Sequence, residues 1–253
     1  MKIQAKLASP QDALALRARH RLEMNCQIVH DSLHRREGWT LCYLLARDGV
    51  AVGFGSVAIA GPWKDKPTVF EFYLLPEDRS RAFDFFEAFL AAAGPSFFEI
   101  QSNDTIATAM ALTYGHNTST EKIIFHDKLE TTLQPHGARL RRVTPQEELE
   151  LALQRQQGGG EWILELDGEL AGKGGILFHY NRPFGDIYME VIEPFRRRGL
   201  GSYLVQELKR SCYELGAVPG ARCNPTNIPS RKTLQRAGFV PFAHILIGSI
   251  ASK

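Results

Sequence analysis

The sequence predicts an α/β protein made of two copies of one domain, each a sheet flanked by helices. Four short segments recur in the same order, the last three at a nearly constant separation and the first at a longer one because the first copy carries extra residues after its opening helix; strand and helix patterns alternate within each copy. The recurring pairs are ASPQDALAL (8–16) with VTPQEELEL (143–151), DGVAVGFGS (48–56) with DGELAGKGG (167–175), LLPEDRSRAF (74–83) with VIEPFRRRGLG (191–201), and QSNDT (101–105) with RCNPT (222–226). This repeat predicts one domain over residues 1–130 and a second over 138–253.

The first elements of the second copy follow from local signals. A helix is expected from Thr144-Pro145, because a capping threonine followed by proline is typical of a helix start. Residues 161–180 predict two strands joined at Asp167-Gly168, since this dipeptide favours the tight turn of a hairpin. The segment DIYMEVIE (186–193) predicts a third strand.

A helix is expected next, because apolar residues recur close to the helical period and a glycine, Gly216, follows them as a stop signal. These apolar residues are Leu200, Leu204, Leu208, Cys212 and Leu215. The chain then predicts a short buried strand at VPGARCN (218–224), a helix at IPSRKTLQRAG (228–238) and a last strand at FVPFAHILIGSI (239–250).

Composition bounds the function. A formal net charge of +2 over 253 residues gives no electrostatic reason to expect nucleic acid or an acidic membrane as partner. No stretch has the apolar length of a signal peptide or a membrane span, so we expect a cytoplasmic protein. The four cysteines (Cys26, Cys42, Cys212 and Cys223) lack C-x-x-C spacing and are expected to be reduced thiols without a metal.

Three arginines and two glycines directly precede the second-copy helix. Backbone N–H groups at a helix N-terminus attract anions, and Gly199 and Gly201 leave room for an anion to approach them. Arg196–Arg198 add positive charge and forked donors suited to phosphate oxygens. The pattern R-x-x-G-x-G therefore predicts a pyrophosphate-binding turn. A Walker loop requires G-x-x-x-x-G-K-[ST], whereas GELAGKGG (168–175) has the wrong spacing and lies on a predicted hairpin. A Rossmann fingerprint requires a third glycine at the position of Leu204.

The stretch EVIEPFRRRGLGSYLVQEL (190–208), followed by GARCNPTNIPSRKTLQRAGF (220–239), resembles the GNAT superfamily of acyl-CoA-dependent N-acetyltransferases. The superfamily signature R/Q-x-x-G-x-G/A is matched by Arg196, Gly199 and Gly201. A second signature, an asparagine followed by a helix and Gly-Phe, is matched by Asn227 and by Gly238-Phe239. The resemblance covers residues 138–253, and the first copy resembles the fold only through its similarity to the second.

The resemblance implies two tandem GNAT-like domains, each with a mixed, mostly antiparallel twisted sheet, and acetyl-CoA as co-substrate without a metal. It implies that the strand before the turn diverges from the strand before Asn227, with the pantetheine arm between them. An N–H near Val191 or Ile192 would then face the thioester carbonyl, and Asn227 would bond the pantetheine arm. The turn residues implied to hold the pyrophosphate are Arg196, Arg197, Arg198, Gly199, Leu200, Gly201 and Ser202.

The reaction implied is direct transfer of an acetyl group to an amine of a small molecule or peptide, by a monomer or homodimer. Glu190 is the first candidate for general base, and a solvated or salt-bridged strand residue is the equal alternative. The tyrosine that protonates the leaving thiolate in many members is replaced by Leu234, for which Tyr203, Tyr188 or Cys223 are possible substitutes. The missing tyrosine keeps open a non-catalytic acyl-CoA-binding sensor or regulatory protein.

The first copy departs from this pattern. Matched to the phosphate-binding turn, it has Asp78 in the place of Arg196 and Phe83 in the place of Gly201, so we expect no phosphate binding there. A structural role, or a wall of the acceptor pocket, is expected instead. The aromatic run at 83–89 is expected to be core or an interface.

His30-Asp31-Ser32-Leu33-His34 is close to the metalloprotease pattern H-E-x-x-H. Aspartate is shorter than the usual base and no third ligand is evident, so a polar helix face is preferred to a zinc site. As an alternative, His30 or His34 lines the acceptor pocket.

Overall fold

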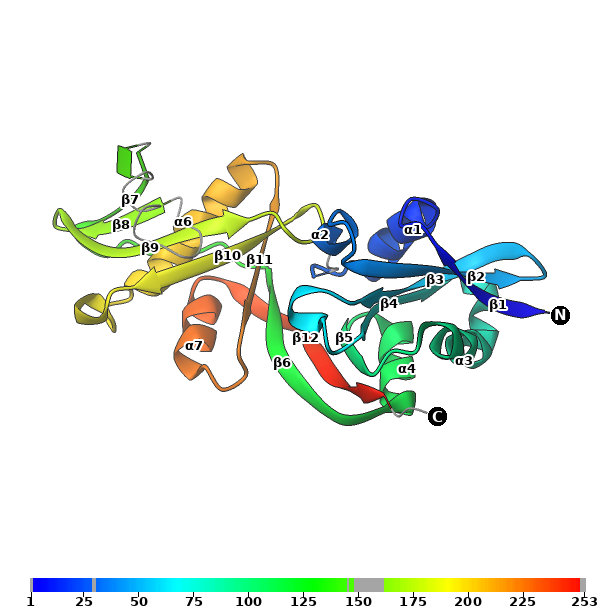
Figure 1. The fold of residues 1–253 in the computed structure, drawn as a ribbon. Coiled ribbons are helices and arrows are strands. Elements are labelled where there is room, and N and C mark those ends of the chain that lie inside the picture. The colour runs from blue at the N-terminus through cyan, green and yellow to red at the C-terminus, as the bar shows by residue number, and fades with distance from the viewer. Residues whose placement is uncertain (1, 29–30, 145, 148–161, 251–253) are drawn as a thin grey trace. The chain divides into compact units, whose positions relative to one another are not determined.

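The computed structural model of the chain describes residues 2–28, 31–144, 146–147 and 162–250 (Figure 1). Its contacts divide the chain into two compact units. The N-terminal unit comprises Met1–Lys122, His179–Asn181 and Ala243–Lys253, and the C-terminal unit comprises Ile123–Phe178 and Arg182–Phe242. Over the described residues, no helix is long and apolar enough to cross a membrane.

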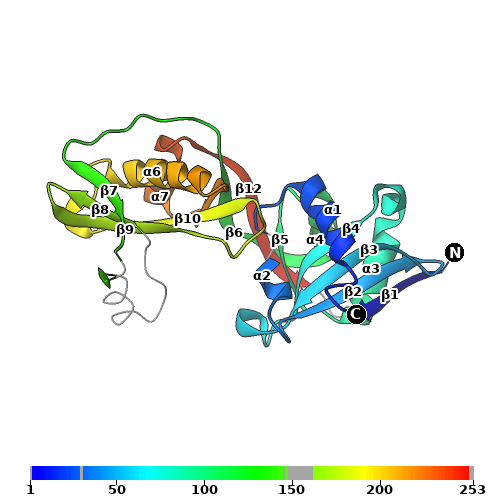
Figure 2. The ribbon, with the colours of Figure 1, turned by 90° about the horizontal axis from the view of Figure 1, so that it is seen from above.

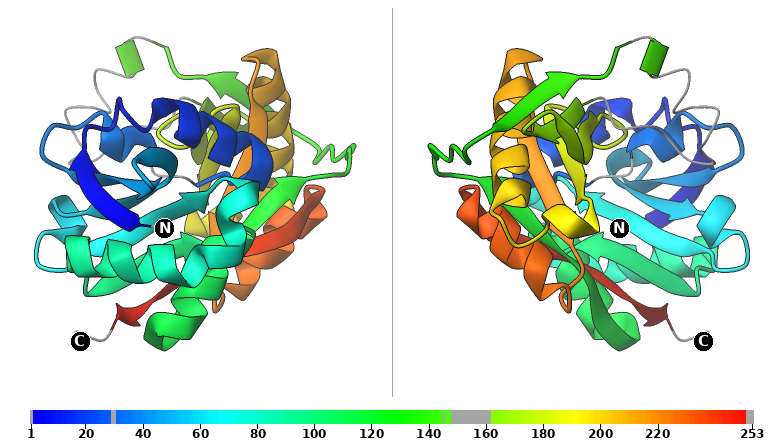
Figure 3. Two further views of the ribbon diagram at one scale, coloured as in Figure 1. Left: turned by 90° about the vertical axis from the view of Figure 1, so that its right-hand side faces the viewer. Right: turned by 90° about the vertical axis from the view of Figure 1, so that its left-hand side faces the viewer.

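The N-terminal unit contains a sheet in the order β1-β2-β3-β4-β5, in which only the β4/β5 pair is parallel. Helix α1 packs on one face of this sheet and α3 on the other (Figure 3). The elements are β1 (Ile3–Ala8), α1 (Leu14–Met24), α2 (Asp31–His34), β2 (Thr40–Arg47), β3 (Val50–Ala58), η1 (Gly61–Trp63), β4 (Thr68–Leu74), η2 (Pro76–Arg81), α3 (Ala82–Ala93), β5 (Phe97–Gln101), α4 (Thr105–Tyr114) and the start of β6 (Gly115–Asp127).

The C-terminal unit repeats this plan, with a sheet in the order β7-β8-β9-β10-β11 in which only β10/β11 is parallel. Helices α6 and α7 pack on the same face of the sheet (Figure 2). The elements are β7 (Ala138–Arg142), β8 (Trp162–Leu166), β9 (Glu169–Leu177), β10 (Phe184–Val191), η3 (Glu193–Phe195), α6 (Leu200–Glu214), β11 (Val218–Cys223), α7 (Ile228–Arg236) and the start of β12 (Phe239–Ile250).

The matching order of elements, with the parallel pair at the same place in each sheet, confirms the predicted fold class. The last strand of each copy, however, pairs outside its own copy. Strand β12 pairs with β5 in the N-terminal unit, and β6 pairs with β11 in the C-terminal unit. The sequence repeat gives no sign of this exchange.

Local predictions for the second copy are confirmed where described residues test them, whereas residues 148–161, over which the helix expected from Thr144 would run, lie outside the described part of the chain. Asp167 and Gly168 join β8 to β9 with φ angles of 51° and 84°, the left-handed conformations that a two-residue hairpin turn requires. Thr144 and Glu147 cap a helix start, because the Thr144 N–H donates to the Glu147 carboxylate over 2.9 Å. Pro145 lies outside the described residues.

Both units bury the apolar residues that their helical periods predict. In α6 four of the five predicted residues are buried, whereas Leu215 lies just after the helix and is 45% exposed. In α3 the aromatic residues Phe85, Phe86 and Phe89 are core, and Phe83 is 53% exposed. The prediction of core for the aromatic run is therefore right except at Phe83.

The histidine-containing segment is not a polar surface. His34 Nε2 lies 2.7 Å from Glu71 Oε2, and both side chains are buried beside Arg17. Burial alone would raise the pKa of Glu71, but the charges of His34 and Arg17 hold it well below its usual range. The prediction of a polar helix face is thus wrong for His34, because its side chain is buried and pairs with the buried carboxylate of Glu71. His30 lies outside the described part of the chain, within which no group of three ligands is placed to hold a metal.

A second buried pair, His20 and Asp104, predicts a pH-dependent stability. Burial lowers the pKa of His20, but the Asp104 carboxylate, 2.6 Å from Nε2, offsets burial and raises it above 6.5. The pair's stabilisation is therefore fully present below about pH 6.5 and lost as the pH rises through the raised pKa.

Asp104→Asn removes the carboxylate charge and keeps a side-chain oxygen that can cap α4. In the wild type this cap is the hydrogen bond from the Ala107 N–H to Asp104 Oδ1. Urea unfolding at about pH 6 and about pH 8.5 should show a larger loss of stability with rising pH in the wild type than in this variant. An identical pH dependence in both proteins would refute the assignment.

Candidate functional site

Strands β10 and β11 diverge within the C-terminal unit (Figure 1). They pair over only three residue pairs, which end at Asp186 and Gly220. Beyond Asp186, β10 stays paired with β9 as far as Val191. Strand β11 is paired with β6 along its other edge. The two strands therefore leave an opening between their edges, as the family resemblance implied.

Backbone groups of β10 face this opening in alternation. The Ile192 N–H donates to the Ala171 carbonyl over 2.9 Å, so it belongs to the β9 side. Because successive residues of a strand point their backbone groups to opposite sides, Val191 and Met189 face the diverging edge. Of the two donors predicted from the sequence, Val191 is thus the available one and Ile192 is not. Met189 is an additional candidate that the resemblance did not indicate.

The turn after β10 leads directly into the N-terminus of α6. Arg196 Nε donates to the Val191 carbonyl over 2.9 Å and fixes the start of the turn. Arg197 and Gly199 then adopt left-handed φ angles of 64° and 79°, and α6 begins at Leu200. Such a turn in front of a helix N-terminus suits an anion, because the first N–H groups of a helix have no partner within the helix.

Space and charge at the turn suit an anion. A Cβ at Gly201 would lie 3.2 Å from Thr233 Cγ2 and 3.5 Å from Met189 Cε, so a side chain there crowds the helix start. Ser202 uses its hydroxyl to hold α7, donating to the Thr233 carbonyl over 3.1 Å. Where the structure describes the chain, the arginines 196–198 form no ion pair with a carboxylate, so their charge is available to a ligand.

Asn227 directly precedes helix α7, and Leu234 lies on it. The Asn227 Oδ1 accepts a hydrogen bond from the Ser230 N–H over 3.1 Å and caps the helix, which leaves the amide Nδ2 as the group for a ligand. Leu234, in the place of the family's tyrosine, is 4% exposed and packs in the core against α6. It offers neither a proton nor a polar contact.

The candidate proton-transfer groups lie in different surroundings. Glu190 is exposed on β10, with its Oε2 3.2 Å from Lys173 Nζ, which fits the salt-bridged alternative. Cys223 is buried in the core, and burial raises the pKa of the Tyr203 phenol, so neither is a ready acid. The Tyr188 ring lies over Gly175, where its hydroxyl would be 2.6 Å from an added Cβ.

Asp186, the last β10 residue paired with β11, was not singled out from the sequence. Its Oδ2 lies 3.3 Å from Arg222 Nε on the sheet face opposite α6. Burial raises the pKa of Asp186, and Arg222 only partly offsets that effect. A buried carboxylate therefore marks the vertex of the opening, a position that only the strand pairing reveals.

The first copy lacks the turn. Arg79 Nε donates to the Leu74 carbonyl over 3.0 Å, which repeats the Arg196–Val191 bond, so Arg79 and not Asp78 stands in the place of Arg196. Asp78 is buried and pairs with Arg47 over 2.8 Å. The segment forms the 3-10 helix η2, which runs directly into α3, and no left-handed glycine opens it.

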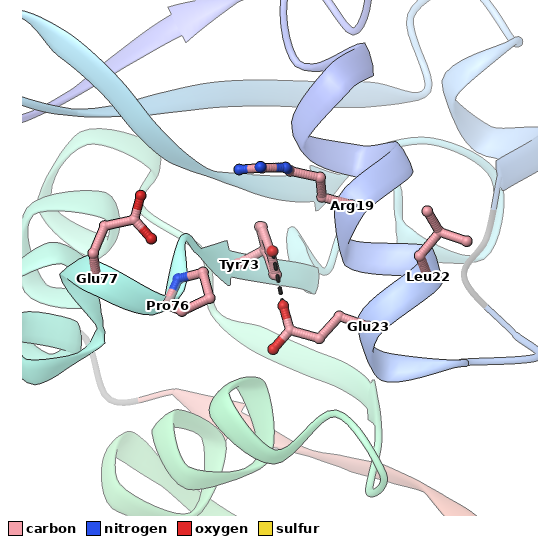
Figure 4. Close-up of a pocket in the computed structure, with 6 residues that line it drawn as sticks. All are labelled: Arg19, Leu22, Glu23, Tyr73, Pro76 and Glu77. Atoms are coloured by element: carbon pink, nitrogen blue, oxygen red, sulfur yellow. Dashed lines mark hydrogen bonds between the residues drawn. The ribbon is translucent and has the colours of Figure 1, made fainter.

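A pocket of about 440 Å³ lies in the N-terminal unit between α1, β4 and η2 (Figure 4). Its lining residues are Arg19, Leu22, Glu23, Tyr73, Pro76 and Glu77. The Tyr73 hydroxyl and Arg79 Nη2 donate to Glu23 over 2.9 and 2.6 Å. This pocket contains none of the residues predicted to bind a coenzyme.

Comparison with known proteins agrees with this geometry. The family model for the acetyltransferase (GNAT) family matches residues 123–239, which include the turn and both signatures. No curated protein sequence matches the chain significantly.

Solved structures match the chain over its whole length. An acetyltransferase of the GNAT family from Colwellia psychrerythraea has a TM-score of 0.74 and 14% identity, covering 99% of this chain and 100% of that one. A tandem GNAT protein from the clavulanic acid biosynthesis pathway has a TM-score of 0.66 and 13% identity, covering 100% of both chains. A GCN5-related N-acetyltransferase from Sphaerobacter thermophilus has a TM-score of 0.61 and 16% identity, covering 99% of this chain and 96% of that one. Residues 123–239 therefore match the acetyltransferase (GNAT) family, and over its whole length the chain has a tandem GNAT fold.

Proposed function

We propose that the second copy binds acetyl-CoA and transfers its acetyl group directly to an amine of a small molecule or peptide. The observation that carries this proposal is the left-handed turn at the open edge of β10, whose three arginines form no ion pair with a described carboxylate. Arg196–Arg198, the N–H groups of residues 199–202 and the α6 dipole would hold the pyrophosphate. Asn227 Nδ2 would donate to the pantetheine arm.

The residues along β10 would then serve the transfer. Acetyl-CoA supplies a thioester whose carbon is attacked by the neutral amine, and its carbonyl oxygen gains negative charge as the new C–N bond forms. The Val191 N–H is the donor we assign to that oxygen. Loss of the C–S bond releases the thiolate of coenzyme A, and the proton of the attacking amine passes to Glu190, directly or through water. No covalent enzyme intermediate is required, because the amine itself attacks the thioester.

Glu190→Gln tests the assigned base. If Glu190 takes the proton, kcat should fall by about 100-fold while the Kd for acetyl-CoA stays unchanged, since general bases contribute about this much. Lys173→Gln, which breaks the same ion pair and keeps the carboxylate, is the matched control. Equal activities of Glu190→Gln and the wild type would show that Glu190 is not the base and only forms a surface ion pair.

The buried Leu234 favours a second candidate function, a non-catalytic acyl-CoA-binding sensor or regulatory protein. The discriminating experiment follows the release of free thiol from acetyl-CoA across a panel of small amines, amino acids and peptides. An enzyme should release thiol in proportion to one class of amine, whereas a sensor should bind acetyl-CoA without turnover with any of them.

The first copy, residues 1–130, is proposed to act as a structural half or as a wall of the acceptor site. Its closed η2 segment supports a role without phosphate binding. We propose a cytoplasmic protein, as a monomer or homodimer, without a nucleic-acid or membrane partner. The small net charge supports that choice of partners.

A further inference from the structure

We propose that Arg236, the last residue of α7, is a phosphate-binding residue of the same coenzyme site. This inference rests on the proposed function and adds a residue from a separate helix to the turn. Neither sequence signature includes Arg236.

The guanidinium of Arg236 lies against the turn. Its two terminal nitrogens are 3.7 Å from the point where a Cβ at Gly199 would stand. Gly199 is the left-handed residue that opens the turn, with φ of 79°. A cation is therefore held beside the N–H groups that precede α6.

Helix α7 is fixed in this position by its other contacts. The Thr233 carbonyl accepts the Ser202 hydroxyl over 3.1 Å, and Leu234 is buried in the core. Arg236 follows these residues directly, so the backbone that carries it is anchored to the start of α6. Packing thus fixes the backbone that carries Arg236, and its exposed side chain reaches the turn from there.

The charge of Arg236 has no protein counterpart in the described chain. Other arginines of the same unit, Arg141, Arg210 and Arg222, each pair with a carboxylate. Arg236 forms no such pair. The turn beside it also carries Arg197 and Arg198, so several positive charges lie in this region. Like charges gathered without acids repel one another, and a multivalent anion would offset that repulsion. Coenzyme A carries two such anions, its pyrophosphate and its 3′-phosphate.

The test is calorimetric titration of coenzyme A and of 3′-dephospho-coenzyme A into the wild type, Arg236→Gln and Arg231→Gln. Arg231→Gln is the matched control, because it makes the same change on the same helix about 140° away around its axis. We expect Arg236→Gln to weaken coenzyme A binding about tenfold and Arg231→Gln to weaken it less than about twofold. Thermal unfolding establishes that both variants fold.

The two ligands separate the sources of the anion. An equal loss for both ligands assigns Arg236 to the pyrophosphate, and a loss for coenzyme A alone assigns it to the 3′-phosphate. Unchanged affinity of folded Arg236→Gln for both ligands would overturn the inference and leave the proposed function intact. No binding of either ligand to the wild type would overturn the proposed function itself.

Discussion

Gly201→Asp should abolish measurable binding of acetyl-CoA. The new Cβ would lie 3.2 Å from Thr233 Cγ2 and 3.5 Å from Met189 Cε, in the space beside the start of α6. Its carboxylate would take up the helix N-terminus and repel the pyrophosphate. We expect affinity to fall at least about 100-fold, which corresponds to about 2.8 kcal/mol. Calorimetric titration of both proteins gives the comparison.

Gly168→Asp is the control for this variant. It adds the same charge to the same unit, in the β8–β9 turn, where a Cβ would meet no atom within 4 Å. Aspartate tolerates the left-handed backbone of that position. We expect the control to bind acetyl-CoA like the wild type. Unchanged binding by folded Gly201→Asp would show that the turn does not hold the coenzyme.

Glu71→Ala should cause the largest loss of stability. Glu71 is 1% exposed, and its Oε2 lies 2.7 Å from His34 Nε2, with Arg17 on its other side. Removal of the carboxylate leaves the buried His34 side chain without its partner and takes away one of the two carboxylates beside Arg17, whose Nη2 stays 2.6 Å from Asp31 Oδ1. We expect the N-terminal unit to lose about 3–5 kcal/mol of its free energy of unfolding, the usual cost of breaking a buried pair.

Urea unfolding, followed separately for each unit by spectroscopic probes, measures this loss. Lys173→Ala is the control, because it breaks an exposed ion pair that should contribute less than about 1 kcal/mol. A loss for Glu71→Ala as small as that of the control would contradict the account of the buried network.

Sequence signals were sufficient for elements whose causes are local. The Asp167-Gly168 turn fixes the β8–β9 hairpin, and the apolar spacing of residues 200–212 fixes the buried face of α6. The exchange of β6 and β12 was not predictable, because strand alternation sets which face of a strand is buried and not which strand lies beside it.

The candidate site shows the same limit. The turn was predictable because its glycines and arginines are consecutive in the sequence. The predicted alignment of the first copy with the turn was wrong by one residue, because it matched Asp78 to Arg196. The hydrogen bond from Arg79 to the Leu74 carbonyl shows that Arg79 takes that place. Asp186 and Arg236 gain their significance from strand divergence and helix packing, which leave no local pattern. His34 resembled a surface histidine because its partner, Glu71, is distant in sequence.

The most direct test of the central claim is calorimetric titration of acetyl-CoA into the wild-type chain. The diverging β10 edge and the left-handed turn at Gly199 predict one binding site per chain. The closed η2 segment predicts none in the first copy. A stoichiometry of one would agree with the account. An absence of binding would contradict the coenzyme site, and a stoichiometry of two would contradict the assignment of the first copy.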